Sequence, residues 1–249
     1  MNVSKIGEWL VNGARIIDLS LTIDPDKSYF HFPVKEVYNR EEPSLKIETV
    51  STHDDGVFWQ KFEMSTQDFT HLDAPKHFDR EGLANHEVPV TQLIGEAVVI
   101  DLTYKKPGEQ VTAKDLEDSG VMVRKGDVVI IRTDWTDKAF GTRRFWSDQI
   151  GLSLDAGDWL VEKGIKALAT DFYTDPQPVK ACEACGALHK VERSEIRNHH
   201  KFLNKGILLI DFVTNLGAIK RDRVILVYLP IKLKGTDGAP ARVIAIEEA

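Results

Sequence analysis

Residues 65–78 have the sequence Ser65-Thr66-Gln67-Asp68-Phe69-Thr70-His71-Leu72-Asp73-Ala74-Pro75-Lys76-His77-Phe78. In an extended segment alternate side chains share a face, so His71 and Asp73 point the same way. Pro75 disfavours a helical conformation at Ala74, which predicts a turn that brings His77 back over the same face. The spacing therefore predicts a metal site with a histidine base beside it. The alternative is a polar surface loop with two exposed histidines and an aspartate.

On both sides of that stretch, apolar runs of strand length alternate with longer amphipathic segments. The expected strands cover 16–21, 97–102, 128–132, 167–171, 207–211, 224–227 and 243–246, and many of their residues are β-branched. Helices are expected at 154–163 and 192–205, because Gly164 and Gly206 follow them as left-handed caps. The alternation predicts an α/β fold in one domain, 1–249. Residues 1–50 are expected to form an N-terminal appendage that contributes to the pocket or to an oligomer interface.

The composition is that of an ordinary globular protein, and the partner expected for it is a small molecule. Of 249 residues, 42% are hydrophobic and 29% charged, and the formal net charge is −7, which argues against nucleic acid or an anionic membrane as the main partner. Two cysteines suit a reducing compartment, and no apolar run approaches the roughly 20 residues that span a bilayer. With no signal-peptide pattern, a cytoplasmic location is expected.

Two further groups of side chains have competing interpretations. Aromatic residues precede the motif, namely Phe30, His31, Phe32, Phe58, Trp59 and Phe62; they fit either core packing or a flat aromatic or heterocyclic substrate. Cys182 and Cys185 with His189 fit a redox pair, part of a zinc site or a plain loop, and the loop is favoured because a second ligand pair is missing. Residues 235–238 indicate a turn.

The motif at 67–77 resembles the H-x-G-T-H-x-D-x-P-x-H signature of the cyclase family of metal-dependent hydrolases, which includes bacterial kynurenine formamidases and isatin hydrolases. Other segments also resemble this family; they are 17–20, 93–101, 170–175, 199–206, 229–231 and 238–242. The resemblance implies a swivelling β/β/α architecture, a homo-oligomer, and a pocket completed across the subunit interface.

In the family's two-metal members, the first two motif histidines and the aspartate hold one ion, and that aspartate bridges to a second ion held by a histidine and a glutamate. The corresponding positions are Gln67, His71, Asp73, His199 and Asp211. The last motif histidine, the family's general base, corresponds to His77.

The chain departs from the family pattern at Gln67, Phe69 and Asp211, where the family has histidine, glycine and glutamate. The Gln67 amide is a neutral oxygen ligand, which shifts metal preference from zinc towards manganese or magnesium. The shorter Asp211 weakens a second site. These departures predict one divalent ion per chain, Mn²⁺ or Zn²⁺.

The resemblance implies a hydrolase that cleaves a linear or cyclic carbon–nitrogen amide bond with metal-activated water. His77 and His199 are the expected catalytic residues; His71, Asp73, Gln67 and Asp211 are the expected ligands; Phe69, Phe32 and Trp59 are the expected substrate contacts. The alternatives are a lactone or ester hydrolase or a cyclase on the same site, and a non-catalytic binding protein that keeps the fold.

Overall fold

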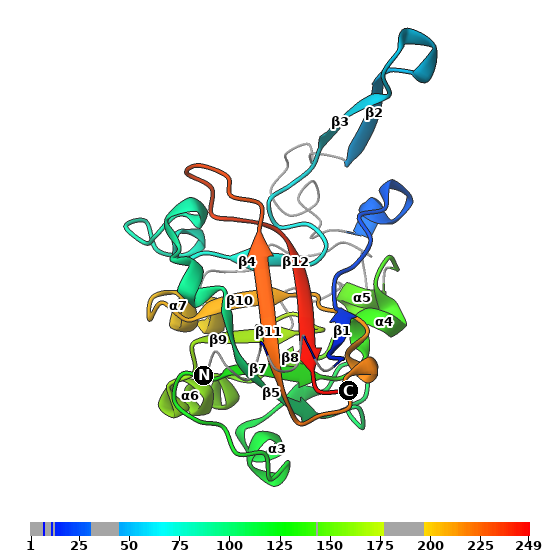
Figure 1. Cartoon of the computed structure of the whole chain (residues 1–249). Coiled ribbons are helices and arrows are strands. Elements are labelled where there is room, and N and C mark those ends of the chain that lie inside the picture. The colour runs from blue at the N-terminus through cyan, green and yellow to red at the C-terminus, as the bar shows by residue number, and fades with distance from the viewer. Residues whose placement is uncertain (1–6, 8–10, 12, 31–44, 143, 177–196) are drawn as a thin grey trace, which may run out of the picture.

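The computed structural model describes residues 7, 11, 13–30, 45–142, 144–176 and 197–249. Its main sheet closes on itself (Figure 1). The strands follow one another in the order β12 (Gly238–Glu247), β11 (Arg223–Pro230), β5 (Ile94–Asp101), β7 (Val128–Arg132), β9 (Ala167–Thr170), β10 (Leu208–Asp211) and β4 (His71–Asp73). Pairing of β4 with β12 completes a seven-strand ring. Strand β1 (Arg15–Asp18) pairs with β12 along the edge that also pairs with β4.

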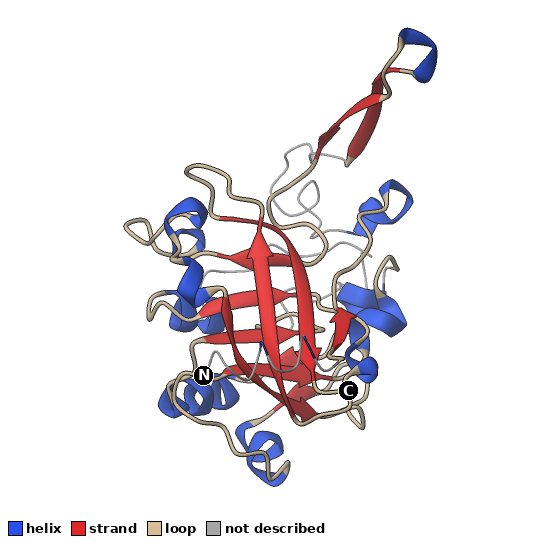
Figure 2. Cartoon of the chain, in the orientation of Figure 1, coloured by secondary structure: helices blue, strands red, loops and turns tan. Residues whose placement is uncertain are grey.

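The ring joins a parallel half to an antiparallel half. Strands β5, β7, β9 and β10 run parallel, and β4, β11 and β12 pair antiparallel with their neighbours. Helices lie in the connections (Figure 2); they are α3 (Ala113–Asp118), α4 (Trp135–Ala139), α5 (Arg144–Ser147), α6 (Leu154–Lys163) and α7 (Arg197–Leu203). The predicted mixed α/β fold is therefore confirmed.

Most strand and cap predictions agree with the structure. The strand at 128–132 and the helix at 154–163 have the expected bounds, and Gly164 and Gly206 have positive φ angles of 69° and 71°. The helix expected at 192–205 is described only from Arg197 onward. Strand β12 is longer than expected because Gly238, Ala239 and Pro240 continue it to pair with β4.

Both faces of the main sheet are buried, so the molecule has one core inside the ring and another between the sheet and the helices. Along β7, Val128 and Ile130 belong to a core inside the ring, whereas Val129 and Ile131 pack with residues of the helices. The same alternation holds on β4, where Leu72 belongs to the inner core. His71 and Asp73 therefore project from the opposite side, toward the helical layer.

The N-terminal segment divides between the ring and a projecting arm. Strand β1 pairs with residues 244–247 of β12, and Ile17 and Leu19 are buried. In contrast, β2 (Lys46–Ser51) and β3 (Trp59–Glu63) form a two-stranded hairpin with a one-turn 3₁₀ helix, η2 (His53–Asp55), near its tip. Figure 1 shows this hairpin projecting from the body, and nearly all its residues are exposed.

The remaining elements are short. A second two-stranded sheet pairs β6 (Gln110–Val111) with β8 (Gly151–Leu152). The other 3₁₀ helices are η1 (Pro25–Phe30), η3 (Pro75–His77), η4 (Asn85–Glu87), η5 (Val90–Gln92) and η6 (Leu216–Ala218). Within the described ranges, every helix is too short or too polar to cross a bilayer.

Candidate active site

Two neighbouring strands bring a histidine and two aspartates together. In the antiparallel pair of β4 and β10, Asp211 lies opposite His71, and Leu209 lies opposite Asp73. One potential ligand atom from each of His71, Asp73 and Asp211 lies within 4.8 Å of the others, and all three residues are buried. The two strands are far apart in sequence but adjacent in the sheet, so the ring closure creates the cluster.

The cluster has the chemistry of a divalent metal site. Burying two carboxylates side by side is unfavourable without compensating positive charge, and burial raises the pKa of the Asp73 carboxyl. Among the described residues, Asp73 Oδ1 has no hydrogen-bond partner. A bound cation would satisfy this buried acceptor. The residues therefore fit a divalent ion.

Backbone strain flanks the cluster. The φ angles of Phe69, which precedes β4, and Phe212, which follows β10, are 55° and 60°. This conformation costs a bulky residue about 1–2 kcal/mol. The carbonyl of Phe69 accepts a 2.8 Å hydrogen bond from His71 Nδ1, and that of Phe212 accepts a 2.7 Å bond from the Thr70 hydroxyl. The strained turns thus hold the imidazole with its Nε2 available to a ligand.

Helix α7 delivers His199 to the same place. Its Nε2 lies 3.6 Å from Asp73 Oδ2 and 3.7 Å from Asp211 Oδ2. Its Nδ1 bonds to the buried carboxylate of Asp175, which also accepts a 2.6 Å bond from the Asn198 backbone. Burial opposes ionisation of His199, but Asp175 and Asp211 outweigh that effect and raise the pKa of His199.

Asp211 is held by neutral hydroxyl groups. Its Oδ1 accepts a 2.9 Å bond from the Thr174 hydroxyl and a 3.3 Å bond from that of Thr170. Its Oδ2 faces His199. Hydroxyl donors fix the carboxylate without neutralising it, so its charge remains available to a cation.

His77 stands at the solvent side of the cluster. It ends the 3₁₀ turn that Pro75 begins, and its ring lies 6.2 Å from that of His199. Its Nδ1 is 2.8 Å from Asp237 Oδ2, and its side chain is 25% exposed. Burial lowers the pKa of His77, but the carboxylates of Asp73 and Asp237 raise it overall. Positive charge beside Asp73 would offset part of that increase and favour a neutral ring.

Gln67 lies beside this group, with its amide oriented by Asp237. Its Nε2 donates a 3.0 Å bond to Asp237 Oδ2. Its Oε1 is buried and has no hydrogen-bond partner within the part of the chain that the structure describes. The amide oxygen thus remains available to a cation while the amide nitrogen is engaged.

Aromatic rings surround the polar cluster. The Phe212 ring meets that of His71 at 5.4 Å, and Phe78 packs 4.6 Å from His77. Tyr173 lies 5.1 Å from His199, and the buried Phe69 packs 5.6 Å from Phe140. The histidines are therefore enclosed by rings on several sides.

The remaining positions singled out in the sequence lie away from the cluster or outside the described residues. Trp59 is 62% exposed on the projecting hairpin rather than at the cluster. Phe32, His31, Cys182, Cys185 and His189 lie outside the described residues.

Sequence analysis missed two carboxylates that hold the histidines. Asp175 was visible only as part of the 170–175 segment, and Asp237 only as part of a turn. Neither shows a local spacing to the histidine that it contacts, since they lie 24 and 160 positions away.

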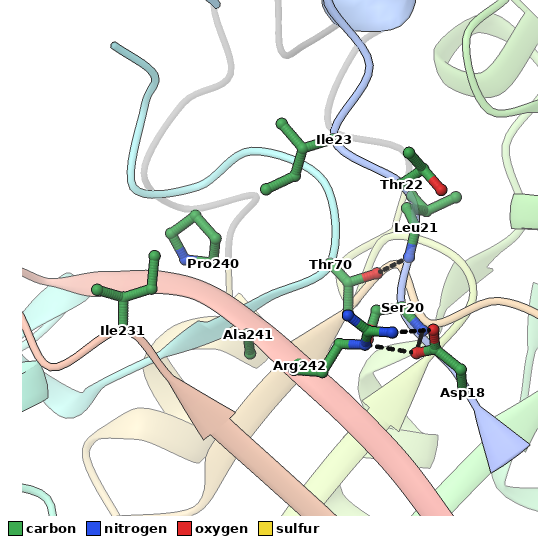
Figure 3. Close-up of a pocket in the computed structure, with 10 residues that line it drawn as sticks. All are labelled: Asp18, Ser20, Leu21, Thr22, Ile23, Thr70, Ile231, Pro240, Ala241 and Arg242. Atoms are coloured by element: carbon green, nitrogen blue, oxygen red, sulfur yellow. Dashed lines mark hydrogen bonds and ion pairs between the residues drawn. The ribbon is translucent and has the colours of Figure 1, made fainter. Parts of the chain in front are cut away.

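A cavity of about 380 Å³ lies beside β12, lined by Leu21, Ile23, Ile231 and Pro240 among others (Figure 3). Its polar side carries the Asp18–Arg242 ion pair, at 2.7 Å. The lining includes Thr70, whose hydroxyl accepts a 2.9 Å bond from the Leu21 backbone. The candidate metal ligands do not line this cavity.

Comparison with known proteins gives consistent similarities. A family described as "Putative cyclase" matches residues 17–175. A kynurenine formamidase of Bacillus cereus is 29% identical over 189 residues, covering 74% of this chain and 78% of that protein. That of Salinibacter ruber is 24% identical over 73% of this chain and 76% of its own length.

Among solved structures, isatin hydrolase A from Labrenzia aggregata, bound to benzyl benzoate, superposes with a TM-score of 0.82. The match covers 100% of both chains at 22% identity. An isatin hydrolase bound to the product analogue thioisatinate gives 0.80 at 20% identity, with 99% of this chain and 98% of that chain covered. At these identities the likeness establishes the shared fold.

Proposed function

This chain belongs to the cyclase family, and from that membership we propose that it is a metal-dependent hydrolase of an amide bond in an aromatic substrate. The observation that carries the proposal is the buried group of His71, Asp73 and Asp211 with His77 at its open side. Its relatives include enzymes named kynurenine formamidase and isatin hydrolase, which supports an aryl amide, open or cyclic, as the substrate class.

In the proposed mechanism, the cation would activate the carbonyl and the water, and His77 transfers the proton. A divalent cation held by His71, Asp73 and Asp211 would polarise the substrate carbonyl and lower the pKa of water. His77 takes the proton of the attacking water at Nε2, because its Nδ1 is committed to Asp237. The same ring then delivers that proton to the leaving nitrogen.

His199 and the surrounding rings complete the proposed site. With Nδ1 held by Asp175, His199 presents Nε2 to Asp73 and Asp211, either as a further ligand or as a proton donor. Phe78 and Tyr173 pack against the catalytic histidines and offer flat apolar walls to an aromatic ring. Phe69 supports the wall at Phe140. Phe32 and Trp59 remain proposed substrate contacts, Trp59 at the site of a neighbouring subunit because it lies on the projecting hairpin of its own chain.

The direct test is hydrolysis of N-formylkynurenine and of isatin by protein stripped of metal and reloaded with Mn²⁺ or Zn²⁺. We expect turnover only after reloading. An aryl lactone, tested in parallel, distinguishes the ester and lactone alternative. If no amide is cleaved with either metal, the protein is not the proposed amide hydrolase, and faster lactone cleavage would redirect the assignment.

We propose one Mn²⁺ or Zn²⁺ ion per chain, with Gln67 as a further ligand through its otherwise unpartnered Oε1. Because imidazole is the better zinc ligand, Gln67→His is expected to tighten zinc binding by about tenfold, or ~1.4 kcal/mol. Isothermal titration calorimetry measures both affinity and stoichiometry. Gln110→His, exposed on β6, is the control. Two tight ions in the natural protein, or unchanged zinc affinity in Gln67→His, would contradict this prediction.

We also propose that the enzyme is a homo-oligomer that acts in the cytoplasm, a location that two cysteines suit. Trp59 and Phe62 lie on opposite faces of the hairpin and are 62% and 61% exposed. An isolated two-stranded hairpin is marginally stable in water, and exposed apolar surface on both faces favours burial against another subunit.

The hairpin proposal predicts that Trp59→Lys shifts the protein from oligomer to monomer, since burial of a charged side chain in place of an aromatic one is unfavourable. Sedimentation velocity at several protein concentrations measures the shift. Met122→Lys replaces another exposed apolar side chain, 70% exposed and outside the hairpin, and is expected to leave the mass unchanged. A monomeric natural protein would refute the oligomer.

A further inference from the structure

The connection between β11 and β12 carries a carboxylate into the active site. Asp237 immediately precedes β12, and three side chains from the motif region converge on it. Its Oδ1 accepts a 2.9 Å bond from the Thr66 hydroxyl. Its Oδ2 lies 3.0 Å from Gln67 Nε2 and 2.8 Å from His77 Nδ1. Both carboxylate oxygens are therefore occupied by donors.

The backbone fixes Asp237 independently of its side chain. Its carbonyl accepts a 2.9 Å bond from the Ala74 backbone, and the carbonyl of Thr236 accepts one from Asn85 at 2.9 Å. At Gly238 an added Cβ would meet Leu72 O at 2.4 Å and Gln67 Nε2 at 2.7 Å. The β11–β12 connection therefore lies so close to Leu72 and Gln67 that a side chain at position 238 would clash with them.

The hydrogen-bond inventory selects one tautomer of His77. A carboxylate only accepts, so the bond to Asp237 places the proton on His77 Nδ1 and leaves Nε2 as the acceptor. Burial by itself would raise the pKa of Asp237, but the bonds from His77, Thr66 and Gln67 lower it below its ordinary value. In this geometry Asp237 acts only as an acceptor, with Thr66, Gln67 and His77 as its donors.

We propose that Asp237 is the positioning residue for His77, holding the ring in the orientation and tautomer that general-base catalysis needs. Thr66 and Gln67 hold Asp237 in turn. The inference rests on the proposed function in taking His77 as the base. The Gln67 side chain then has two roles. Its Oε1 is a proposed metal ligand, and its Nε2 bonds to the carboxylate that orients His77.

The test compares Asp237→Asn and Asp237→Ala with the natural protein, all loaded with zinc. The single carbonyl oxygen of asparagine cannot satisfy three donors, and alanine accepts from none. We expect kcat to fall by about 10- to 100-fold, as when an orienting partner is lost, with KM changed less than about twofold. Zinc content is expected to stay stoichiometric. Asp237→Glu is expected to recover part of the lost kcat.

Histidine ¹⁵N chemical shifts of the zinc-loaded proteins report the tautomer without reference to turnover. The natural protein should show His77 protonated at Nδ1, and both variants should show a mixture or the opposite tautomer. Asp115→Asn is the control, because Asp115 also accepts from threonine and tyrosine hydroxyls but belongs to the capping box of α3, whose N-cap is Thr112. It is expected to leave kcat and the His77 signals unchanged.

The outcomes separate this inference from the proposed function. Unchanged tautomer in both Asp237 variants overturns the positioning role, whether or not the protein hydrolyses amides. Altered tautomer in a protein that cleaves no amide supports the positioning of His77 and refutes the proposed reaction. Loss of zinc or a drop in melting temperature that accounts for the lost activity would show that Asp237 is only structural.

Discussion

Asp73→Asn is expected to abolish metal binding and to lower kcat/KM by more than about 100-fold, a larger loss than that of an outer hydrogen-bond partner. Asp73 faces both His71 and His199 within the buried cluster. The substitution keeps the shape of the side chain but removes the charge that attracts the cation. Metal content after dialysis and steady-state kinetics measure the two losses.

Thermal unfolding provides a second measurement on the same variant. At a metal concentration about 100 times Kd, binding adds ~2.7 kcal/mol to the free energy of unfolding. The natural protein should show this gain, and Asp73→Asn should not. Without metal, the variant should be the more stable of the two, because it no longer buries two carboxylates side by side. Asp118→Asn, on the exposed end of α3, is the matched control. A metal-dependent stabilisation retained by Asp73→Asn would remove Asp73 from the ligand set.

His77→Ala is expected to lower kcat by about 100-fold or more, the usual contribution of a positioned base, while the metal remains bound. The reason is spatial separation: His77 bonds to Asp237 and stands at the solvent side, whereas the ligand group is buried beneath it.

Metal content and kcat, measured together on His77→Ala, distinguish the loss of a base from the loss of a metal ligand. Exogenous imidazole should restore part of the activity, since the substitution leaves space for a free base. Turnover equal to that of the natural protein would eliminate the general-base assignment. Loss of metal together with activity would instead place His77 among the ligands.

Local patterns predicted the parts of the site that lie within a few residues of one another. The alternation of His71, Leu72 and Asp73 gives their faces without knowledge of any other strand. Pro75 marks the turn to His77, and glycines mark two helix ends. Family resemblance then added His199 and Asp211, which no local spacing connects to the motif.

Sequence patterns could not predict the contacts between segments that are distant in the chain. Asp175 and Asp237 show no periodicity relative to the histidines that they hold. Similarly, the exposure of Trp59 depends on the hairpin leaving the body of the fold, which β propensity alone does not determine. Positive φ at Phe69 and Phe212 also contradicts residue preference, and both carbonyls accept hydrogen bonds from residues of the motif.

Because β12 closes the ring, the candidate site is complete only once this strand has paired with β4. Its pairing with β4 joins segments that are far apart in sequence, as at Asp73 and Gly238, so the chain must lose much entropy before this contact forms. High contact order of this kind slows folding. A nascent chain lacking β12 has the histidine motif but not the strand that pairs with it, as Gly238 pairs with Asp73. The candidate site is therefore expected to form only after β12 has emerged from the ribosome.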